Sequence, residues 1–376
     1  MRRRNSSFNP IQGTKRKLGR KTITVRAVYT PSSVAEYKGN ILIECLPPFF
    51  ETEPPIERLA VRPPYDASER HASFLHRFAA LDRIKLMLET MTWHISVMYQ
   101  IMRNLYSGYV PRNPLADKQA ESQALYERIM ASKKMEAHGE VEAAHAPMFG
   151  LLGGSAMGKS TVVNRILSFL PQIILHDQHN NLLQLVWLKV DCTTKGSINT
   201  LLLWIVQEAD RVLDSDYEAR LSSRPTYGEL AAVVLTIFHT HKLGLLVLDE
   251  IQNVVLTGTG VSKENFFTGF PNFGGVPIMY VGLHETLHHI PAEMHTTRRM
   301  VDDGGTILGV QMTEDEWDDY LGTLVEYQWT KEVAALEEVK ETLTNITQRI
   351  PGISSRLWQI CQARVIEAEA IYEYYL

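Results

Sequence analysis

The sequence contains few cysteines and no long apolar run. Only three cysteines occur in 376 residues, and Cys45, Cys192 and Cys361 stand far apart with no CxxC pair among them. This spacing excludes a disulfide framework and favours free thiols in a reducing cytoplasm. No apolar stretch approaches the ~20 residues that a membrane-spanning helix needs, and no apolar signal segment follows the basic N-terminus. We therefore expect a cytoplasmic protein without a membrane partner.

Acidic residues are absent from the first 35 positions, although the whole chain carries a net charge of −5. Nine Lys and Arg residues occupy that part of the chain, all of them within residues 1–27. A flexible basic arm can bind nucleic acid by neutralising phosphates, although a solubilising tail without a partner has the same composition. We predict that residues 1–27 form such an arm.

Long helical patterns are also missing from the segment that follows the arm. Residues 28–66 are rich in proline and aromatic residues, and proline at this density prevents long helices. Across residues 67–107 apolar side chains recur at three- and four-residue steps, and a more polar helix is predicted over residues 114–137. Residues 28–140 are therefore predicted to form an N-terminal Pro/aromatic strap and helical module.

The most informative motif lies between Gly153 and Ser160. It fits the pattern G-x-x-x-x-G-K-[ST], with an apolar strand-like run before it and an amphipathic helix after it. Glycine lets such a loop turn its backbone N–H groups toward a phosphate, and the following helix adds the positive end of its dipole. We predict that Lys159 reaches the β- and γ-phosphates and that Ser160 holds Mg²⁺. The predicted nucleotide-binding residues are Gly153, Gly154, Ser155, Ala156, Met157, Gly158, Lys159, Ser160 and Thr161.

Strand-like and helical segments alternate around this loop, which predicts an α/β fold with a five-stranded parallel sheet. The predicted strands are residues 149–153, 185–191, 245–249, 276–282 and 306–310, and the predicted helices between them are residues 159–170, 198–213, 227–242 and 264–267. Three more helices are predicted over residues 314–328, 330–349 and 354–374. We expect an ATPase core over residues 141–310 and a helical lid over residues 311–376.

Two adjacent carboxylates, Asp249 and Glu250, end an apolar run that starts at Leu245. A buried parallel strand that ends in acids delivers them to the carboxyl edge of the sheet, where ligands bind. We predict that Asp249 holds Mg²⁺ directly or through water, and that Glu250 polarises the attacking water as the general base. No Asn-Lys-x-Asp motif for reading guanine follows, which favours ATP over GTP.

Four further side chains are candidates for contacts with the nucleotide. His284 follows the fourth predicted strand, where Leu283 stands in place of the small polar residue that such ATPases usually carry. Arg298 and Arg299 form either a salt-bridged surface pair or an arginine finger for a neighbouring subunit, because a guanidinium grips phosphoryl oxygens. Arg356, at the start of the last helix, is predicted to reach the nucleotide from the lid.

A short polar loop follows the second predicted strand. It contains Thr193, Thr194 and Lys195. Loops on this edge often line the central channel of ring ATPases, where a lysine and two threonines can hold a DNA backbone. An ordinary solvated loop is the alternative.

Several phrases of the sequence together resemble the TniB/TnsC-type AAA+ ATPases of transposons. The resemblance implies a AAA+ P-loop NTPase that uses ATP and Mg²⁺ and forms ring or helical homo-oligomers on double-stranded DNA. In that family the oligomers link a target-selection protein to the transposase, and hydrolysis dismantles them. It also implies a bacterial cytoplasmic protein that joins the nucleoid when bound to DNA. The phrases are residues 37–40, 46–48, 108–114, 153–160, 186–192, 245–250, 325–329 and 344–364.

Two other functions stay open at this point. A helicase-loader-type AAA+ ATPase shares the fold and the chemistry but has a helicase as its partner. An interaction scaffold would hold ATP as a structural ligand and would not bind DNA.

Overall fold

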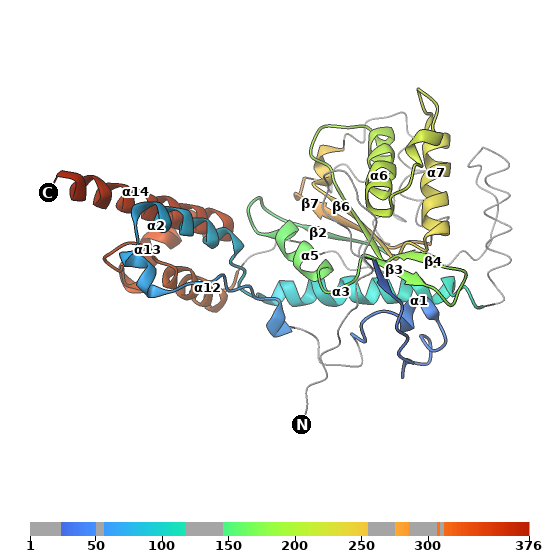
Figure 1. The fold of residues 1–376 in the computed structure, drawn as a ribbon, viewed down its shortest axis with the longest axis horizontal. Helices are drawn as coiled ribbons and strands as arrows, with labels where there is room; N and C mark the ends of the chain where they lie inside the picture. The colour runs from blue at the N-terminus through green and yellow to red at the C-terminus, as the bar shows by residue number, and fades with distance from the viewer. Residues whose placement is uncertain are drawn as a thin grey trace. The chain divides into compact units, whose positions relative to one another are not determined.

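The computed structural model describes residues 24–49, 56–116, 146–254, 275–285, 307–308 and 312–375. They divide into two compact units, whose elements are drawn in Figure 1. Unit 1 falls within residues 1–54, 97–152 and 164–308, and unit 2 within residues 55–96, 153–163 and 309–376. The domain boundaries predicted after residues 27, 140 and 310 stay a prediction.

A parallel sheet forms the centre of unit 1, with the strand order β5-β6-β7-β2-β8. Strands β2, β6 and β7 bury every residue, as expected where both faces of a parallel sheet are covered. The predicted α/β fold with a parallel sheet is therefore confirmed. The strands are β2 (Met148–Leu152), β5 (Trp187–Asp191), β6 (Leu245–Asp249), β7 (Ile278–Gly282) and β8 (Ile307–Leu308).

Two helices, α6 (Ile198–Leu213) and α7 (Tyr227–Thr240), pack side by side on this sheet (Figure 1). The hydroxyl of Ser197 accepts a hydrogen bond from the backbone N–H of Thr200, which satisfies a free donor at the start of α6. Apolar side chains of both helices recur at three- and four-residue steps and enter the same core as those of β5, β6 and β7.

The end of helix α3 (Thr92–Tyr109) packs within unit 1 against the start of β6. The hydroxyl of Tyr109 donates to the carbonyl of Lys242, 3.1 Å away. A Cβ at Gly244 would lie 2.4 Å from this hydroxyl, so only glycine permits the approach. The short helix η4 (Val110–Arg112) follows, between the helical pattern predicted up to residue 107 and the helix predicted from residue 114.

A second, three-stranded sheet in unit 1 was not predicted from the sequence. Strand β1 (Thr24–Arg26) pairs in parallel with β3 (Ile173–His176), and β3 pairs in antiparallel with β4 (Leu182–Leu185). The prediction of a flexible arm is wrong for residues 24–26, because their backbone completes this sheet. Residues 1–23, which hold the other eight basic side chains, lie outside the described residues.

A polar cluster fastens the strap to this sheet. The Tyr29 hydroxyl lies 2.8 Å from Nδ1 of His176, and Nε2 of His176 lies 2.7 Å from Oε1 of Gln184. The thiol of Cys45 donates to the same Gln184 oxygen over 3.1 Å. Burial raises the pKa of Cys45 and lowers the pKa of His176, so the thiol stays protonated and inert. The short helix α1 (Ile41–Glu44) precedes Cys45.

Unit 2 is mostly helical (Figure 1). In the module predicted over residues 67–107, only α3 is a long helix, and residues 67–86 form two 3₁₀ helices and one short α-helix. Phe74, Phe78 and Leu86 are exposed although their spacing predicts core positions. Leu86 lies in a 3₁₀ helix, which repeats every three residues, so a 3.6-residue stripe does not stay on one face there. The elements are η1 (Ile56–Arg58), η2 (Ala67–His71), α2 (Phe74–Ala80), η3 (Leu81–Leu86), α12 (Glu314–Glu326), α13 (Leu336–Thr347) and α14 (Pro351–Tyr375).

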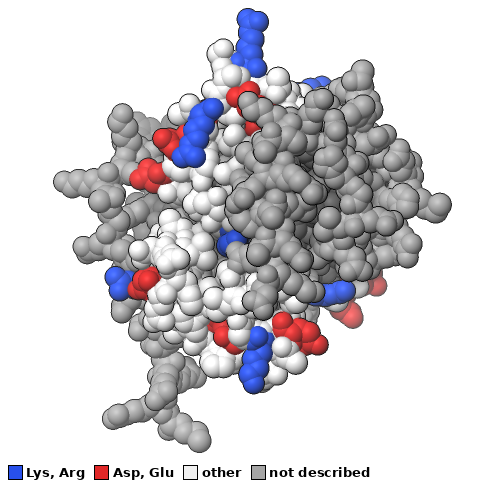
Figure 2. Space-filling model, turned by 90° about the vertical axis from the view of Figure 1, so that its right-hand side faces the viewer, with Lys and Arg blue, Asp and Glu red and all other residues white. Residues whose placement is uncertain are grey.

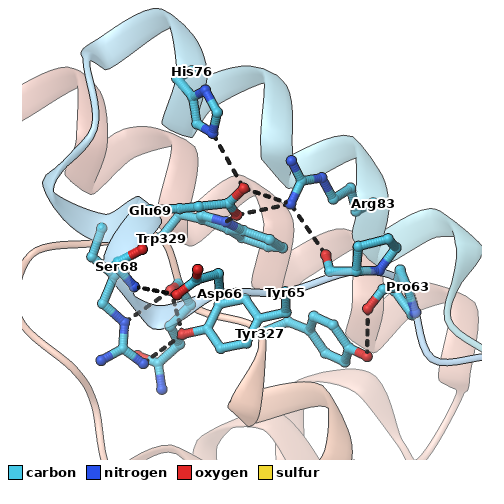
Figure 3. A network of polar contacts seen from close by, with 12 residues as sticks. Pro63, Tyr65, Asp66, Ser68, Glu69, His76, Arg83, Tyr327 and Trp329 are labelled. Atoms are coloured by element: carbon cyan, nitrogen blue, oxygen red, sulfur yellow. Dashed lines mark hydrogen bonds and ion pairs between the residues drawn. The ribbon is translucent and has the colours of Figure 1, made fainter.

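Glu69 is the centre of a polar cluster that joins the two halves of unit 2 (Figure 3). Its carboxylate accepts hydrogen bonds from Arg83 over 2.8 and 3.0 Å and from the indole N–H of Trp329 over 2.8 Å. His76 lies 3.3 Å from the same group. The hydrogen bonds from Arg83 and Trp329 lower the pKa of Glu69 to about 2. Segments more than 240 residues apart in the chain are fastened here.

Some other predicted elements lie outside the described residues, and some have slightly different limits in the structure. The helix predicted over 264–267 and, from residue 117 on, the helix predicted over 114–137 lie outside the described residues. Among the described residues, no helix is both long and apolar enough to cross a bilayer.

Candidate functional site

The predicted phosphate loop follows β2 directly and leads into helix α5 (Lys159–Leu167). Ala156 and Gly158 both adopt positive φ values, +61° and +83°. Such values reverse the chain within a few residues, which explains why the loop contains small residues at these positions. The loop apex, residues 154–156, is exposed, while Met157 is buried and anchors the loop.

Lys159 is held against its own loop. Its side chain is 8% exposed, and Nζ donates to the carbonyl oxygens of Gly153 over 3.1 Å and Gly154 over 2.6 Å. A nearly buried ammonium needs such acceptors, because an unpaired buried charge is very costly. The sequence motif thus places its cation on the inner side of the loop.

Within unit 2, the start of helix α14 contacts this loop. The backbone N–H of Gly352 donates to the carbonyl of Ala156 over 2.9 Å, and a Cβ at Gly352 would lie 2.7 Å from that oxygen. Arg356 lies one turn further along α14, is exposed, and donates to Oε1 of Gln359 over 2.7 Å. Its predicted contact with the nucleotide stays a prediction.

The carboxyl edge of the sheet in unit 1 carries the predicted acidic residues. Register pairs Asp191 with Asp249 and Leu248 with Tyr280, so the carboxyl ends of β5, β6 and β7 meet at one edge. Asp249 is nearly fully buried, and its Oδ1 accepts a hydrogen bond from the backbone N–H of Glu250 over 2.9 Å. The next residue, Glu250, is exposed.

Lys189 is a residue of this edge that sequence reasoning missed. Its Nζ lies 2.8 Å from Oδ2 of Asp249 and also pairs with Asp191. Burial disfavours the charged ammonium, but the hydrogen bonds to Asp191 and Asp249 outweigh it, and the pKa of Lys189 is raised. A single lysine within the apolar run 185–190 was the available signal, because a charge on an inner strand needs a partner.

The turn after β6 holds Glu250 in an unusual conformation. Glu250 has φ +55° and ψ +38°. These values lie in the left-handed region of backbone conformations, which residues other than glycine rarely adopt. Gln252 and Asn253 in the short helix η6 (Ile251–Asn253) make side-chain contacts from this turn. Left-handed residues of this kind cluster at functional sites, where the surrounding contacts hold them in place.

The remaining predicted residues are placed as follows. Thr193, Thr194 and Lys195 are all exposed on the loop between β5 and α6, at the carboxyl end of β5. His284 is exposed in the turn after β7. Arg298 and Arg299 lie outside the described residues. The roles of these side chains stay predictions.

A magnesium site built by the protein alone does not occur in the described part of the chain. No group of three or more His, Cys, Asp or Glu side chains there is arranged to hold a metal ion. The residues predicted as metal ligands offer a hydroxyl (Ser160) and a carboxylate (Asp249). Hard oxygen donors of this number fit Mg²⁺, which is usually bound by one or two protein ligands together with substrate phosphates.

Comparisons with known proteins agree with this arrangement. Residues 143–290 match the family model of a AAA domain, which implies a P-loop NTPase that binds nucleotide. No curated protein sequence matches the chain.

Solved structures give distant fold similarities. The Cdc6p structure from Pyrobaculum aerophilum is 15% identical, covers 56% of this chain and 49% of its own, and has a TM-score of 0.33. The Aeropyrum pernix ORC1 protein in complex with DNA is 15% identical, with 71% and 64% coverage and a TM-score of 0.43. Domain III of the Thermotoga maritima replication initiation protein DnaA is 15% identical, with 61% and 80% coverage and a TM-score of 0.31. This chain therefore spans less than two thirds of the first two structures, and the family match covers residues 143–290.

Proposed function

We propose that this chain is an ATP-hydrolysing, DNA-binding AAA+ regulator of the TniB/TnsC type. It assembles into homo-oligomers on target DNA and links a target-selection protein to a transposase, and hydrolysis dismantles the assembly. The observation that carries the nucleotide part is the phosphate loop, with its two left-handed residues and its inward lysine. The transposition part is supported by the sequence resemblance.

ATP binding exchanges contacts that the loop now makes with itself. The ammonium of Lys159 leaves the carbonyls of Gly153 and Gly154 for the β- and γ-phosphates, which are stronger acceptors because they are charged. The N-terminus of α5 and the loop N–H groups face the same phosphates. This arrangement stabilises the negative charge of the phosphates. In a solvent-exposed glycine turn without these groups, only water would solvate that charge.

In this proposal, hydrolysis uses the acidic edge. Glu250, exposed at the start of the turn, accepts a proton from the attacking water. Asp249 and the hydroxyl of Ser160 fit Mg²⁺, which supplies charge neutralisation at the phosphates when it is bound with the nucleotide. Arg298 or Arg299 of a neighbouring subunit, Arg356 and His284 are the proposed further contacts with phosphate oxygens.

DNA binding is assigned to the basic N-terminal residues and to the loop that contains Lys195. On the face that Figure 2 draws, Lys and Arg side chains of the described residues stand beside Asp and Glu side chains, without a large area of one sign. The proposal therefore rests on the exposed loop and on the eight basic residues before β1.

Two substitutions test the nucleotide site. Lys159→Ala should abolish ATP binding, measured with a fluorescent ATP analogue, because the phosphates lose their mobile cation. Glu250→Gln should bind ATP normally and lower the hydrolysis rate by roughly 10²–10⁴-fold, because an amide does not accept the proton. Lys340→Ala, which removes a surface ion pair of Lys340 with Asp318, is the matched control and should change neither. Unchanged ATP affinity in Lys159→Ala would reject the site.

A separate experiment tests the DNA part. Removing residues 1–23 keeps β1 and should flatten the dependence of DNA affinity on salt, because fewer counterions are released. Lys195→Ala should act in the same direction, with Lys340→Ala again as the control. ATP-dependent capture of a transposase supports the regulator, whereas capture of a helicase indicates a loader. ATP binding with no DNA affinity under any condition would leave only the scaffold function.

A further inference from the structure

In unit 1, the side chain of Gln252 connects the turn that carries Glu250 with the end of β7. The proposed hydrolysis requires these two parts to keep a fixed position relative to each other. Its Nε2 donates to a carboxylate oxygen of Glu250 over 2.5 Å. Its Oε1 accepts the backbone N–H of Leu283 over 3.2 Å. Leu283 is the residue that follows β7, so one side chain connects the Glu250 carboxylate with the end of the neighbouring strand.

The chemistry of this bridge requires an amide. A carboxylate only accepts hydrogen bonds and a backbone N–H only donates, so the linking group must donate at one end and accept at the other. The amide of Gln252 does both, and its orientation is fixed by the two partners. Glutamate lacks the donor, and lysine lacks the acceptor.

The same turn is braced on its other side by Asn253. Its Nδ2 donates to the carbonyl of Cys192 over 2.7 Å, and its own carbonyl accepts from the N–H of Gly196 over 3.1 Å. The turn that holds Glu250 in its left-handed conformation is thus fastened to the end of β7 through Gln252 and to the loop after β5 through Asn253. Contacts on both sides of the turn offset the free-energy cost of the left-handed conformation. The turn cannot leave this conformation without breaking these hydrogen bonds.

We propose that Gln252 is a positioning residue that holds the Glu250 carboxylate for hydrolysis and ties it to the end of β7. The side chain of Leu283 has no hydrogen-bonding group, so Gln252 makes the connection to the end of β7 through the backbone N–H of Leu283. The inference rests on the proposed function, in which Glu250 is the general base. Gln252 acts through Glu250 and contacts neither water nor nucleotide in the reaction.

Two substitutions separate the contacts of Gln252. Gln252→Met keeps the length of the side chain and removes both hydrogen bonds. Gln252→Glu keeps an acceptor for Leu283, removes the donor to Glu250 and adds a like charge beside it. The matched control is Gln207→Glu, because Gln207 makes an equivalent contact with Glu218 over 2.7 Å, exposed on α6 and away from the turn.

The measured quantities are kcat, the affinity for ATP and the melting temperature. Gln252→Met should lower kcat by about tenfold, the effect of one hydrogen bond to a charged group. Gln252→Glu should lower it at least as much, and both should leave the affinity for ATP within about twofold. Gln207→Glu should leave all three quantities unchanged. A purely structural role would instead lower the melting temperature and the ATP affinity together with kcat, and would overturn the inference.

A double substitution shows whether Gln252 acts through Glu250. In the Glu250→Gln background, Gln252→Met should leave the residual hydrolysis rate unchanged, because the carboxylate that it positions is gone. The same fold loss in both backgrounds, or a rise in kcat in Gln252→Met alone, would overturn the inference. Full hydrolysis in Glu250→Gln would instead reject the proposed general base itself. An inactive Glu250→Gln with fully active Gln252→Met and Gln252→Glu would reject only the role of Gln252.

Discussion

The parallel sheet of unit 1 and the core of unit 2 are built by different means. In unit 1, β2, β6 and β7 are buried along their whole length and consist almost entirely of apolar residues. In unit 2, the buried side chains include Arg77, Gln328, Gln359 and Gln362. Arg77, Gln359 and Gln362 donate to backbone carbonyls of segments far away in the sequence, whereas the amide of Gln328 donates to carbonyls of nearby residues.

This difference has a consequence for how each unit responds to substitution. Apolar burial is not directional and contributes about 25 cal/mol per Å² of buried surface. Removing one buried methylene therefore removes only a small part of the apolar contribution to the free energy of unfolding. A buried polar pair is directional, and removing one partner leaves the other desolvated without a hydrogen bond. The parallel sheet of unit 1 should therefore tolerate small apolar truncations, while unit 2 should be sensitive to the loss of a single polar partner.

The largest expected effect on stability is that of Arg77→Met in unit 2. Arg77 is 1% exposed, pairs with Glu369 and donates to the carbonyl of Trp329 over 3.3 Å. Its removal leaves a partly buried carboxylate without its cation, so the free energy of unfolding should fall by about 3–5 kcal/mol. Denaturant titration of the variant and the parent protein measures the difference.

The control for this substitution lies on α14, the helix that carries Glu369. Arg364 pairs with Glu367 of α14 over 3.0 Å, but its side chain is 78% exposed. Arg364→Met should therefore change the free energy of unfolding by less than about 1 kcal/mol. If the two variants lost equal stability, the buried polar contacts of unit 2 would be no more sensitive than its exposed ones.

The next largest effect is the response of unit 2 to acid. His94 is 1% exposed, and burial lowers its pKa to about 3, while the nearby Glu316 has the opposite and smaller influence. The folded state thus keeps His94 neutral, whereas the unfolded chain binds a proton below the ordinary value of about 6.5. The unfolded state binds more protons across this window, so stability falls as the pH falls from 6.5 toward 3.

From pH 7 to pH 5, His94 alone should remove about 2 kcal/mol from the free energy of unfolding. In His94→Gln the side chain still offers an acceptor to the N–H of Met91, which His94 accepts over 3.2 Å, but it does not titrate. Denaturant titrations at the two pH values should show a smaller loss in this variant than in the parent. Equal losses would mean that other groups cause the acid sensitivity.

The contrast between the units also explains which features could be predicted from the sequence. The predicted limits of α6 and β6 coincide with the structure, because a 3.6-residue apolar stripe and a continuous apolar run are local signals. The start of α14 was predicted three residues late, at residue 354, although proline is common in the first turn of a helix. The phosphate loop was recognised because its motif is contiguous.

The features that escaped prediction depend on partners distant in the chain. Strand β1 has only three residues and exists because β3 is available to pair with it. Lys189 gains its contact with Asp249, and Gln252 its contact with Leu283, only when neighbouring strands align. The lone lysine in the apolar run 185–190 indicates that a partner is needed but not which one, so the predicted site contained the two acids but not the side chains that hold them.

The smallest expected effect gives the comparison its quantitative scale. Ile278 of β7 is fully buried, so Ile278→Val removes one methylene from the core of unit 1 and should cost about 0.5–1.5 kcal/mol. Ile346→Val on α13 makes the same chemical change at a side chain that is 62% exposed, and should stay within about 0.5 kcal/mol. Both are measured as a shift of the denaturation midpoint at unchanged slope, because neither substitution alters the surface exposed on unfolding. If Ile278→Val lowered the free energy of unfolding as much as Arg77→Met, the apolar sheet would be packed too tightly to relax around the cavity. Directional polar contacts would then not explain why unit 2 is more sensitive to substitution than the sheet of unit 1.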